Sequence, residues 1–425
     1  MATALLALRR SRRMARPRQE FSLSPRSRLG LNAANFFLAE VCGVVVPFLS
    51  KYLSERGWTD GSVGMAMALG GLGVFLMQTP AGFLVDRIRQ RRALLAGASL
   101  TLGLCYGLLP LLPARGILLN PLLFLAGMSH SFFAPLLGAL ALGLAGHVGL
   151  NRLMGANQGW NHAGNLTAAL VAIVLVAWLP VASIFYAVAA VSVLAAASVF
   201  AIRAEDVNEE LACGGHNSGK PSVGFFALLR DRRVAVLFAA VALFHLANAP
   251  VMPLVGLYVG RLGGSNAQVA CVVLVAQAVM IPVAWLAGQL GESWGRKPVF
   301  AIGFLVLPLR IVLYSLANSP WMLVALQTLD GIGAGIYGVI IVSTCADLTR
   351  GTGHFNALQG LIATALSIGG VLGPFIAGFT VQYLGFAAAF YLFAAIAAVA
   401  ALLFVLFMPE TKRLTASGGR QPPVE

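Results

Sequence analysis

The sequence predicts an all-α membrane protein with twelve transmembrane helices arranged in two six-helix halves related by pseudo-symmetry. Hydrophobic residues make up 59% of the 425 residues, and charged residues only 10%, against about 25% in ordinary globular proteins. Apolar runs of about 20 residues recur along the chain, without the alternation of a transmembrane barrel. A short motif of Gly, Leu, a carboxylate and a basic cluster occurs twice, which indicates two similar bundles joined end to end.

The apolar runs divide the chain into twelve spans with one long polar interruption, residues 203–233. We therefore expect a basic cytoplasmic tail (1–28), an N-terminal bundle (29–202), a cytoplasmic linker (203–233), a C-terminal bundle (234–408) and a second cytoplasmic tail (409–425). The spans are expected at residues 29–52, 61–85, 92–112, 117–143, 153–178, 181–202, 234–259, 266–290, 298–317, 320–344, 354–381 and 384–408.

The Lys and Arg residues predict the orientation in the membrane. With the N-terminus in the cytoplasm, most of the 29 Lys and Arg residues fall in the tails and loops on the cytoplasmic side. The positive-inside rule favours this arrangement, so both termini are expected to be cytoplasmic. Contact with anionic lipid headgroups then explains the net charge of +14, and no nucleic-acid partner is expected. The Arg-, Ala- and Gly-rich composition suggests a bacterial inner (plasma) membrane.

Other classes of site are not expected. The five Cys residues are scattered and odd in number, which fits neither a disulfide framework nor a zinc site. Cys213 and His216 alone are too few ligands for a metal ion. The glycine clusters at 70–73 and 331–335 lie inside apolar spans without a following Gly-Lys-Ser/Thr, so they indicate helix packing rather than nucleotide binding. No nucleophile–base pair is present, and we predict no enzyme activity, metal or cofactor.

The two copies of the motif differ in detail. The first copy comprises Gly82, Leu84, Asp86 and Arg87, followed by Arg89, Arg91 and Arg92. The second comprises Gly288, Leu290 and Glu292, followed by Gly295, Arg296 and Lys297.

Together with the twelve spans, these motifs resemble the major facilitator superfamily. Its members carry a Gly-x-Leu-x-Asp-Arg-x-Gly-Arg-Arg loop between helices 2 and 3. The first copy departs from it by Arg89 in place of Gly, and the second by Glu292 in place of Asp. The resemblance covers about residues 29–410, and the chain looks most similar to poorly characterised bacterial members of unassigned subfamily.

The resemblance implies a secondary transporter that moves a small organic solute through a lipid bilayer by alternating access. Proton-coupled efflux by a monomer is the leading expectation, and proton-coupled uptake of a metabolite or metal complex is the alternative. A non-transporting membrane sensor or assembly component is the alternative of another class. Helix 5 lacks the Gly-Pro ending of the superfamily's drug–proton antiporters, whereas helix 11 carries Gly373 and Pro374.

The repeated motif is interpreted as a pair of conformational latches. A carboxylate beside long basic side chains at a helix end can pair with, or cap, a helix of the other half while one side of the transporter is closed. The alternative is a cluster of charges that only sets topology. The candidate latch residues are Gly82, Asp86, Arg87, Gly288, Glu292 and Arg296.

Charged residues at membrane depth are candidates for coupling or substrate binding because they are costly there. Arg310 and Asp330 lie at similar depth on neighbouring antiparallel spans, so they can pair; the alternative is a purely structural pair. Glu40 is the candidate proton-coupling carboxylate, unless it pairs with His245 or lies near the interface. In the superfamily helices 1, 4, 7 and 10 usually line the cavity, which adds His130, His245, Asn248 and Gln327 as candidates.

The fifth span carries the clearest polar pattern. Spacings of three and four place its polar residues along one helical stripe, which must face protein or water rather than lipid. A substrate pathway and simple hydrogen bonding between helices both satisfy this requirement. The residues of this polar stripe are Asn157, Gln158, Asn161, His162 and Asn165.

Overall fold

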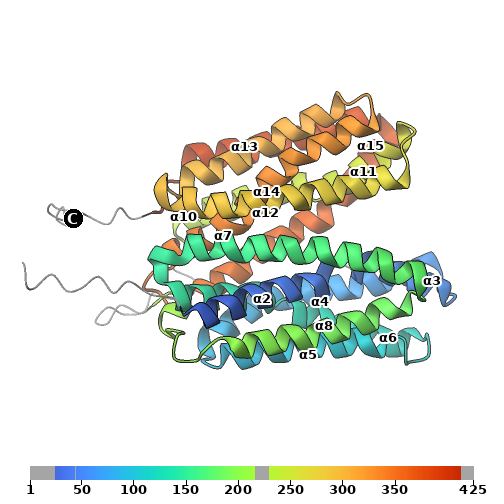
Figure 1. The fold of residues 1–425 in the computed structure, drawn as a ribbon. Coiled ribbons are helices and arrows are strands. Elements are labelled where there is room, and N and C mark those ends of the chain that lie inside the picture. Colours follow the sequence, from blue (N-terminus) through green and yellow to red (C-terminus); the bar gives the residue numbers. More distant parts are fainter. Residues whose placement is uncertain (1–23, 44, 216–228, 413–425) are drawn as a thin grey trace, which may run out of the picture.

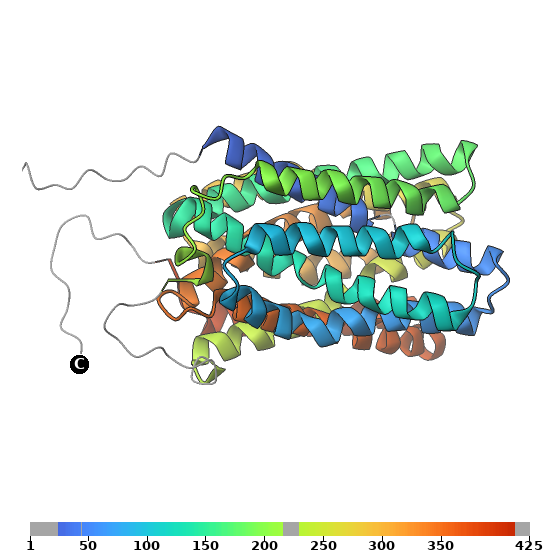
Figure 2. The same cartoon turned by 90° about the horizontal axis from the view of Figure 1, so that it is seen from below.

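The structure is a computed structural model that describes residues 24–43, 45–215 and 229–412. The described residues form thirteen α-helices and one short 3-10 turn, η1 (Leu211–Cys213), without a β-strand among them. The helices run side by side along one direction, with α2 to α8 in the lower part of Figure 1 and α10 to α14 in the upper part. Figure 2 shows the same bundle from the side of the N-terminal half.

The N-terminal half consists of six spans. Its first span is divided between α2 and α3, and Thr59 caps the helix that follows by accepting a hydrogen bond from the Ser62 N–H. The helices are α2 (Pro25–Gly43), α3 (Val45–Glu55), α4 (Asp60–Arg87), α5 (Arg91–Leu108), α6 (Gly116–His130), α7 (Phe133–Trp178) and α8 (Ala182–Ala201).

The C-terminal half repeats this arrangement, beginning with a span divided between α10 and α11. Ser265 and Gln268 form a capping box at the start of α12, and Ser319 caps α14, whose first residue is Pro320. The helices are α10 (Arg232–Asn248), α11 (Val251–Arg261), α12 (Asn266–Ser293), α13 (Arg296–Ser315), α14 (Pro320–Leu348) and α15 (Phe355–Phe407).

Two glycines turn the chain back within apparently continuous helices. Gly146 has φ 60° inside α7, and Gly385 has φ 84° inside α15. These left-handed values suit glycine because it has no Cβ. Thus α7 contains the end of the fourth span and the whole fifth span, and α15 contains the last two spans. The fifth span starts earlier than predicted, just after Gly146, because its first polar residues belong to the helix rather than to a loop.

The predicted all-helical membrane fold is confirmed. Eight stretches of the described chain are long and apolar enough to cross a membrane, and two of them, Gly116–Trp178 and Phe355–Phe407, contain the turns described above. The α2/α3 pair and α5 complete the bundle of twelve spans. Large apolar side chains such as Ile117 (83% exposed) and Trp178 (85% exposed) lie on its outer surface, where a bilayer would cover them.

The two halves meet through glycine-rich helix crossings. Helix α4 packs against α15, and α7 packs against α12 and α14. A Cβ on Gly155 of α7 would lie 2.8 Å from the Ala284 carbonyl oxygen, and one on Gly360 of α15 would lie 2.5 Å from the Gln78 carbonyl oxygen. Backbone therefore contacts backbone across the interface, as is common where small residues pack transmembrane helices.

The crossing of α4 and α6 within the N-terminal half gives a first prediction. A Cβ on Gly127 would lie 2.1 Å from the Gly70 carbonyl oxygen, whereas one on Gly71, also in this region, would meet nothing within 4 Å. We expect Gly127→Ala to lower the thermal unfolding midpoint in detergent, through an overpacking cost of about 1–3 kcal/mol. Gly71→Ala is the matched control, and equal midpoints for both variants would contradict the close crossing.

Candidate functional site

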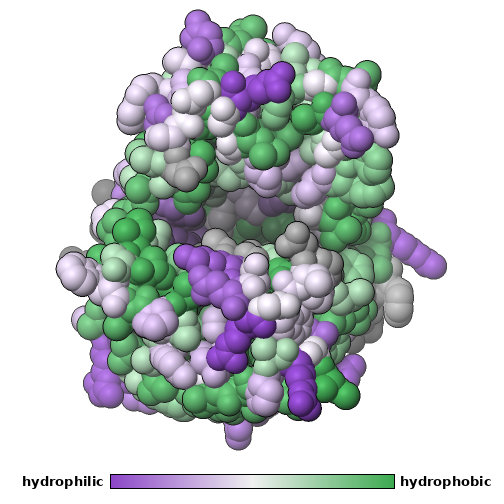
Figure 3. Space-filling view, turned by 90° about the vertical axis from the view of Figure 1, so that its right-hand side faces the viewer, coloured by the Kyte–Doolittle hydropathy of each residue, from purple (hydrophilic) through white to green (hydrophobic). Residues whose placement is uncertain are grey.

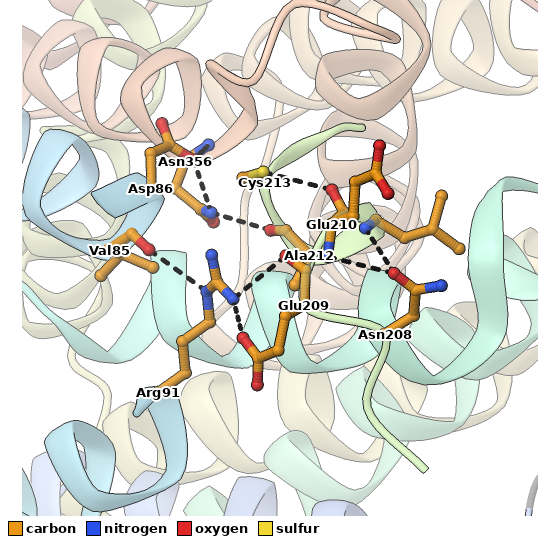
Figure 4. A network of polar contacts seen from close by, with 10 residues as sticks. Val85, Asp86, Arg91, Asn208, Glu209, Glu210, Ala212, Cys213 and Asn356 are labelled. Atoms are coloured by element: carbon orange, nitrogen blue, oxygen red, sulfur yellow. Dashed lines mark hydrogen bonds and ion pairs between the residues drawn. The ribbon is translucent and has the colours of Figure 1, made fainter. Parts of the chain in front are cut away.

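The last turn of α4 caps a helix of the opposite half. The Asp86 carboxylate accepts hydrogen bonds from the backbone N–H groups of Asn356 (3.1 Å) and Ala357 (2.8 Å), and from the Asn356 side-chain amide (2.9 Å). These N–H groups lie in the first turn of α15, whose preceding residue, His354, makes no side-chain capping bond. Asp86 therefore satisfies orphan donors and meets the positive end of the helix dipole across the interface between the halves (Figure 4).

Gly82 makes this capping contact possible. A Cβ at Gly82 would lie 2.2 Å from the Asn356 carbonyl oxygen and 3.0 Å from the Ala357 Cα atom. Any side chain would push α4 away from α15, and the carboxylate one turn later would lose its hydrogen bonds. The glycine and the carboxylate of the motif thus form one unit, which a charge cluster that only sets topology does not require.

The second copy of the motif makes a related contact at the end of α12, to a backbone N–H inside α7 rather than at a helix start. Glu292 accepts a hydrogen bond from the backbone N–H of Arg152 (3.0 Å), in the other half, and lies 3.8 Å from its Nε atom. A Cβ on Gly288 would lie 2.6 Å from the Asn151 carbonyl oxygen. The end of the bundle at which α4 and α12 finish is therefore closed by two related contacts, and we call it the latch end.

The helices that receive the latches share a short sequence pattern. Both read Asn-x-Leu-x-Gly, from Asn151 to Gly155 in α7 and from Asn356 to Gly360 in α15. In each, the residue after the Asn donates its N–H to the latch carboxylate, and the Gly packs on the helix that bears it. The sequence reasoning missed this second repeat, although its spacing was available to find it.

The basic residues of the motif occupy different places. Arg87 is exposed and makes no ion pair within the described chain. Arg91 is 2% exposed, donates to the Val85 carbonyl oxygen (3.2 Å) and pairs with Glu209. In the second copy the buried Arg296 donates to the Gly291 carbonyl oxygen (2.7 Å) and pairs with Asp347 (3.1 Å). In both copies a buried arginine thus holds the carbonyl that precedes the latch carboxylate.

The segment after α8 takes part in the same network. Ala212 of η1 accepts a hydrogen bond from the Asn356 side chain (3.0 Å), and the Gly351 N–H donates to the Gly214 carbonyl oxygen (2.8 Å). Neighbouring Asn208 donates its N–H to the Gly143 carbonyl oxygen (3.0 Å). The segment is therefore bonded to both halves at the latch end, beside Asp86 and Arg91 (Figure 4).

The opposite end of the bundle is hollowed between the two halves (Figure 3), and we call it the open end. A cavity at mid-depth lies among α7, α10, α13 and α14. A second lobe, lined by α10, α11, α13 and α14, shares three of its residues with the first: Asn248, Arg310 and Asp330. A wedge closed at one end and open at the other is the form expected of one state of an alternating-access protein.

An ion pair lies where the two lobes of the cavity meet. Arg310 of α13 pairs with Asp330 of α14 and donates to the Asn248 side-chain oxygen of α10 (2.5 Å). Arg310 is 3% exposed and Asp330 8% exposed. Gln327, one turn before Asp330, lines the second lobe and donates to the Leu323 carbonyl oxygen (3.2 Å). A pair of opposite charges at this depth is tolerated because each neutralises the other.

The other residues that were predicted to line the cavity do not all lie there. His245 lines the cavity, with its ring edge-on to Tyr337 at 5.0 Å between centroids. His130 is exposed, stacks edge-on against Phe133 (5.6 Å) and does not line either lobe. Glu40 lies in α2, but its side chain is outside the part of the chain that the structure describes.

The polar stripe of α7 faces helix α2 with some of its residues and the cavity with others. Asn161 donates to the Asn35 carbonyl oxygen of α2 (3.5 Å), and Asn165 donates to the Asn161 side-chain oxygen (3.3 Å), while Asn157 is fully buried. Gln158 and His162 line the cavity, and the His162 Nδ1 atom lies 3.0 Å from the Gln277 side-chain oxygen of α12. Hydrogen bonding between helices therefore accounts for one part of the stripe, and the cavity for the other.

Fold, latches and cavity together define a two-bundle membrane transport protein. The family model described as "MFS_1 like family" matches residues 29–415. The chain therefore belongs to the major facilitator superfamily, whose members are transporters and not enzymes.

Relatives and solved structures agree with this assignment. An uncharacterized MFS-type transporter of Mycobacterium tuberculosis is 37% identical over 398 residues, which cover 92% of this chain and 95% of that protein. The quinolone resistance protein NorA of Staphylococcus aureus is 21% identical over 189 residues, covering 44% of this chain and 48% of NorA. The solved structure of the proton:xylose symporter XylE matches with a TM-score of 0.71 at 14% identity, covering 92% of this chain and 96% of XylE.

Removal of the first latch should open the latch end and expose a native thiol. Cys213 is 5% exposed, and burial raises the pKa of its thiol, so it should react slowly with a maleimide at neutral pH. Asp86→Ala removes charge-assisted hydrogen bonds worth about 1.5–3 kcal/mol each. We expect Cys213 labelling of the detergent-solubilised protein to become about tenfold faster or more, since 1.4 kcal/mol is a factor of ten.

Two further variants control this measurement. Asp86→Ala combined with Cys213→Ser identifies the reactive thiol, because the additional labelling should disappear. Arg87→Ala changes an exposed residue in the same turn and should leave the rate unchanged. If Asp86→Ala labels no faster than Arg87→Ala, the latch end is not held by Asp86.

Proposed function

We propose that this protein is a proton-coupled secondary transporter of a small organic solute that works by alternating access. The observation that carries the proposal is the wedge between the halves, closed at one end by a carboxylate contact from each half to the other and holding a buried ion pair at mid-depth. A sensor or assembly component needs neither a cavity at mid-depth nor contacts at the latch end that can break and re-form.

The positive-inside rule places the latch end in the cytoplasm. Arg89, Arg92 and Lys297 lie at this end, beside the latches. The structure then represents the outward-facing state, and the transport cycle breaks the contacts of Asp86 and Glu292 while the open end closes. A bacterial inner membrane, cytoplasmic termini and a monomeric working unit complete the proposal.

Asp330 is the carboxylate that the cavity supports best as the proton site. While Asp330 is ionised, it neutralises Arg310; when Asp330 takes up a proton, the guanidinium loses its counter-ion and becomes available to a solute. Proton uptake and solute binding are thereby linked through one contact. Glu40, which the sequence placed at membrane depth in α2, is the second candidate for this role.

The two directions of transport rest on different observations. Efflux, the leading expectation from the sequence, is supported by the similarity to the quinolone resistance protein NorA. Co-transport of solute and proton is supported by the ion pair, because a solute that engages Arg310 leaves Asp330 free to take up a proton. A solute that engaged Asp330 would instead compete with the proton, as antiport requires.

Flux in proteoliposomes tests coupling and direction together. We expect an imposed pH gradient to drive accumulation of at least one solute from a panel of labelled small organic compounds. Accumulation in an alkaline lumen shows co-transport, and accumulation in an acidic lumen shows antiport. Asp330→Asn should abolish gradient-driven accumulation while solute exchange persists, because the exchange step needs no proton movement.

Carboxylate variants elsewhere serve as controls. Glu55→Gln alters an exposed pair with Lys51 at the end of α3 and should transport normally. If Glu40→Gln uncouples flux and Asp330→Asn does not, the proton site belongs to Glu40. Absence of gradient-driven movement for every solute in the wild-type protein would falsify proton-coupled transport.

A further inference from the structure

Four side chains around the cavity have buried polar atoms without a hydrogen-bond partner among the described residues. All four residues line the first lobe, although they come from four different helices. A cavity that collects unsatisfied polar atoms from several elements is poised for a ligand, since a buried polar group without a partner is costly. The atoms are Arg310 Nε, Tyr337 Oη, His245 Nε2 and His162 Nε2.

Donor groups without a partner in the described part of the chain line this cavity. The Arg310 guanidinium carries five N–H donors, and the acceptors described for them are Asp330 and Asn248. The Asn248 side-chain oxygen and the Oδ1 atom of Asp330 are already engaged by Arg310. The Nε–H of Arg310 and the hydroxyl of Tyr337 therefore need an acceptor, which a ligand can bring. A guanidinium fork matches a carboxylate better than any neutral acceptor.

The rest of the lobe is apolar and partly aromatic. Phe244 and Tyr337 stack with centroids 5.7 Å apart and an interplanar angle of 10°. Val306, Leu307 and Leu329 complete the apolar lining. An apolar wall beside a few converging polar groups is the usual design of a small-molecule site.

We propose that the cavity binds small organic acids, with the carboxylate on Arg310 and an apolar body against Phe244 and Tyr337. This inference rests on the proposed transport function and names the substrate class for it. Tyr337 and His245 supply the additional contacts to the acid.

Charge balance couples this acid to a proton. The Arg310–Asp330 pair is neutral, so an anion that takes over Arg310 leaves Asp330 as an unpaired buried charge unless it is protonated. The titratable groups that face the pair are His245 from α10, His162 from α7, Tyr337 from α14 and Tyr314 from α13, whereas α11 contributes apolar residues. Binding of the acid should therefore strengthen as pH falls, as long as the acid itself stays ionised.

Three naphthalene probes of matched shape test the charge preference. They are 1-naphthoate, the neutral 1-naphthamide and the cationic 1-naphthylmethylammonium. The readout is the probe-dependent rise of the thermal unfolding midpoint of the purified full-length protein in detergent, from which apparent Kd values follow. We expect the carboxylate to bind about tenfold tighter than the amide, and the cation to bind weakest.

Two variants of the ion pair should change naphthoate affinity in opposite directions. Asp330→Asn removes the competing carboxylate and should tighten naphthoate binding several-fold while removing its pH dependence. Arg310→Gln should weaken naphthoate about tenfold or more and leave naphthamide unchanged. Arg310→Lys keeps the charge without the fork and is expected to give an intermediate affinity, so the test survives if Arg310→Gln fails to fold. Arg115→Gln, at an exposed residue outside the cavity lining, is the matched control.

The outcomes separate this inference from the proposed transport function. Equal affinity for naphthoate and naphthamide, or binding of neither at millimolar concentration, overturns the organic-acid site. A parallel loss of affinity in Asp330→Asn and Arg310→Gln also overturns it, because a purely structural pair behaves in that way. Since binding is measured without flux, naphthoate binding without any solute transport retains the site and refutes the transporter. Transport of other solutes, without tighter binding of naphthoate than of naphthamide, supports the transporter and overturns the organic-acid site.

Discussion

Two carboxylates that accept backbone hydrogen bonds from the opposite half hold the two halves together at one end. Asp86 at the end of α4 meets the first turn of α15, and Glu292 at the end of α12 meets the fifth span in α7. The Asp86 contact is a helix cap made in trans, so it satisfies donors in the first turn of α15 that would otherwise be unpaired. Glu292 instead accepts from a backbone N–H inside α7. The glycine one turn earlier allows the backbones to approach. Such a contact stabilises one state strongly and disappears entirely when the helices separate.

The cavity is a consequence of this closure. Because the halves are pinned at the latch end, a hollow opens between them at the opposite end (Figure 3), and the cavity lies among α7, α10, α13 and α14. Arg310 and Asp330 occupy that depth and neutralise each other while no ligand is bound. Exchange of one partner for a ligand group or a proton changes the charge of the cavity, which gives a physical route from binding to conformational change.

Much of the fold follows from simple rules applied to the sequence. Apolar length predicted the spans, and the depth of Arg310 and Asp330 on antiparallel neighbours placed them within reach of each other. The turn at Gly146 was harder to locate, since His147, Asn151 and Arg152 look like loop residues although they belong to a helix. The backbone partners of Asp86 carry no residue-type signature, so only the Asn-x-Leu-x-Gly repeat could have pointed to them. Within the motif, the sequence could not distinguish the exposed Arg87 from the buried Arg91.

Spin-label distances across both ends of the molecule test the latch most directly. Labels at exposed Arg89 and Ser293 would report the latch end, and labels at exposed Arg115 and Asn318 the open end. In a protein with both Asp86→Ala and Glu292→Ala, the distance at the latch end should lengthen while the distance at the open end shortens. Unchanged distances, or an increase at both ends, would contradict a latch that controls alternating access.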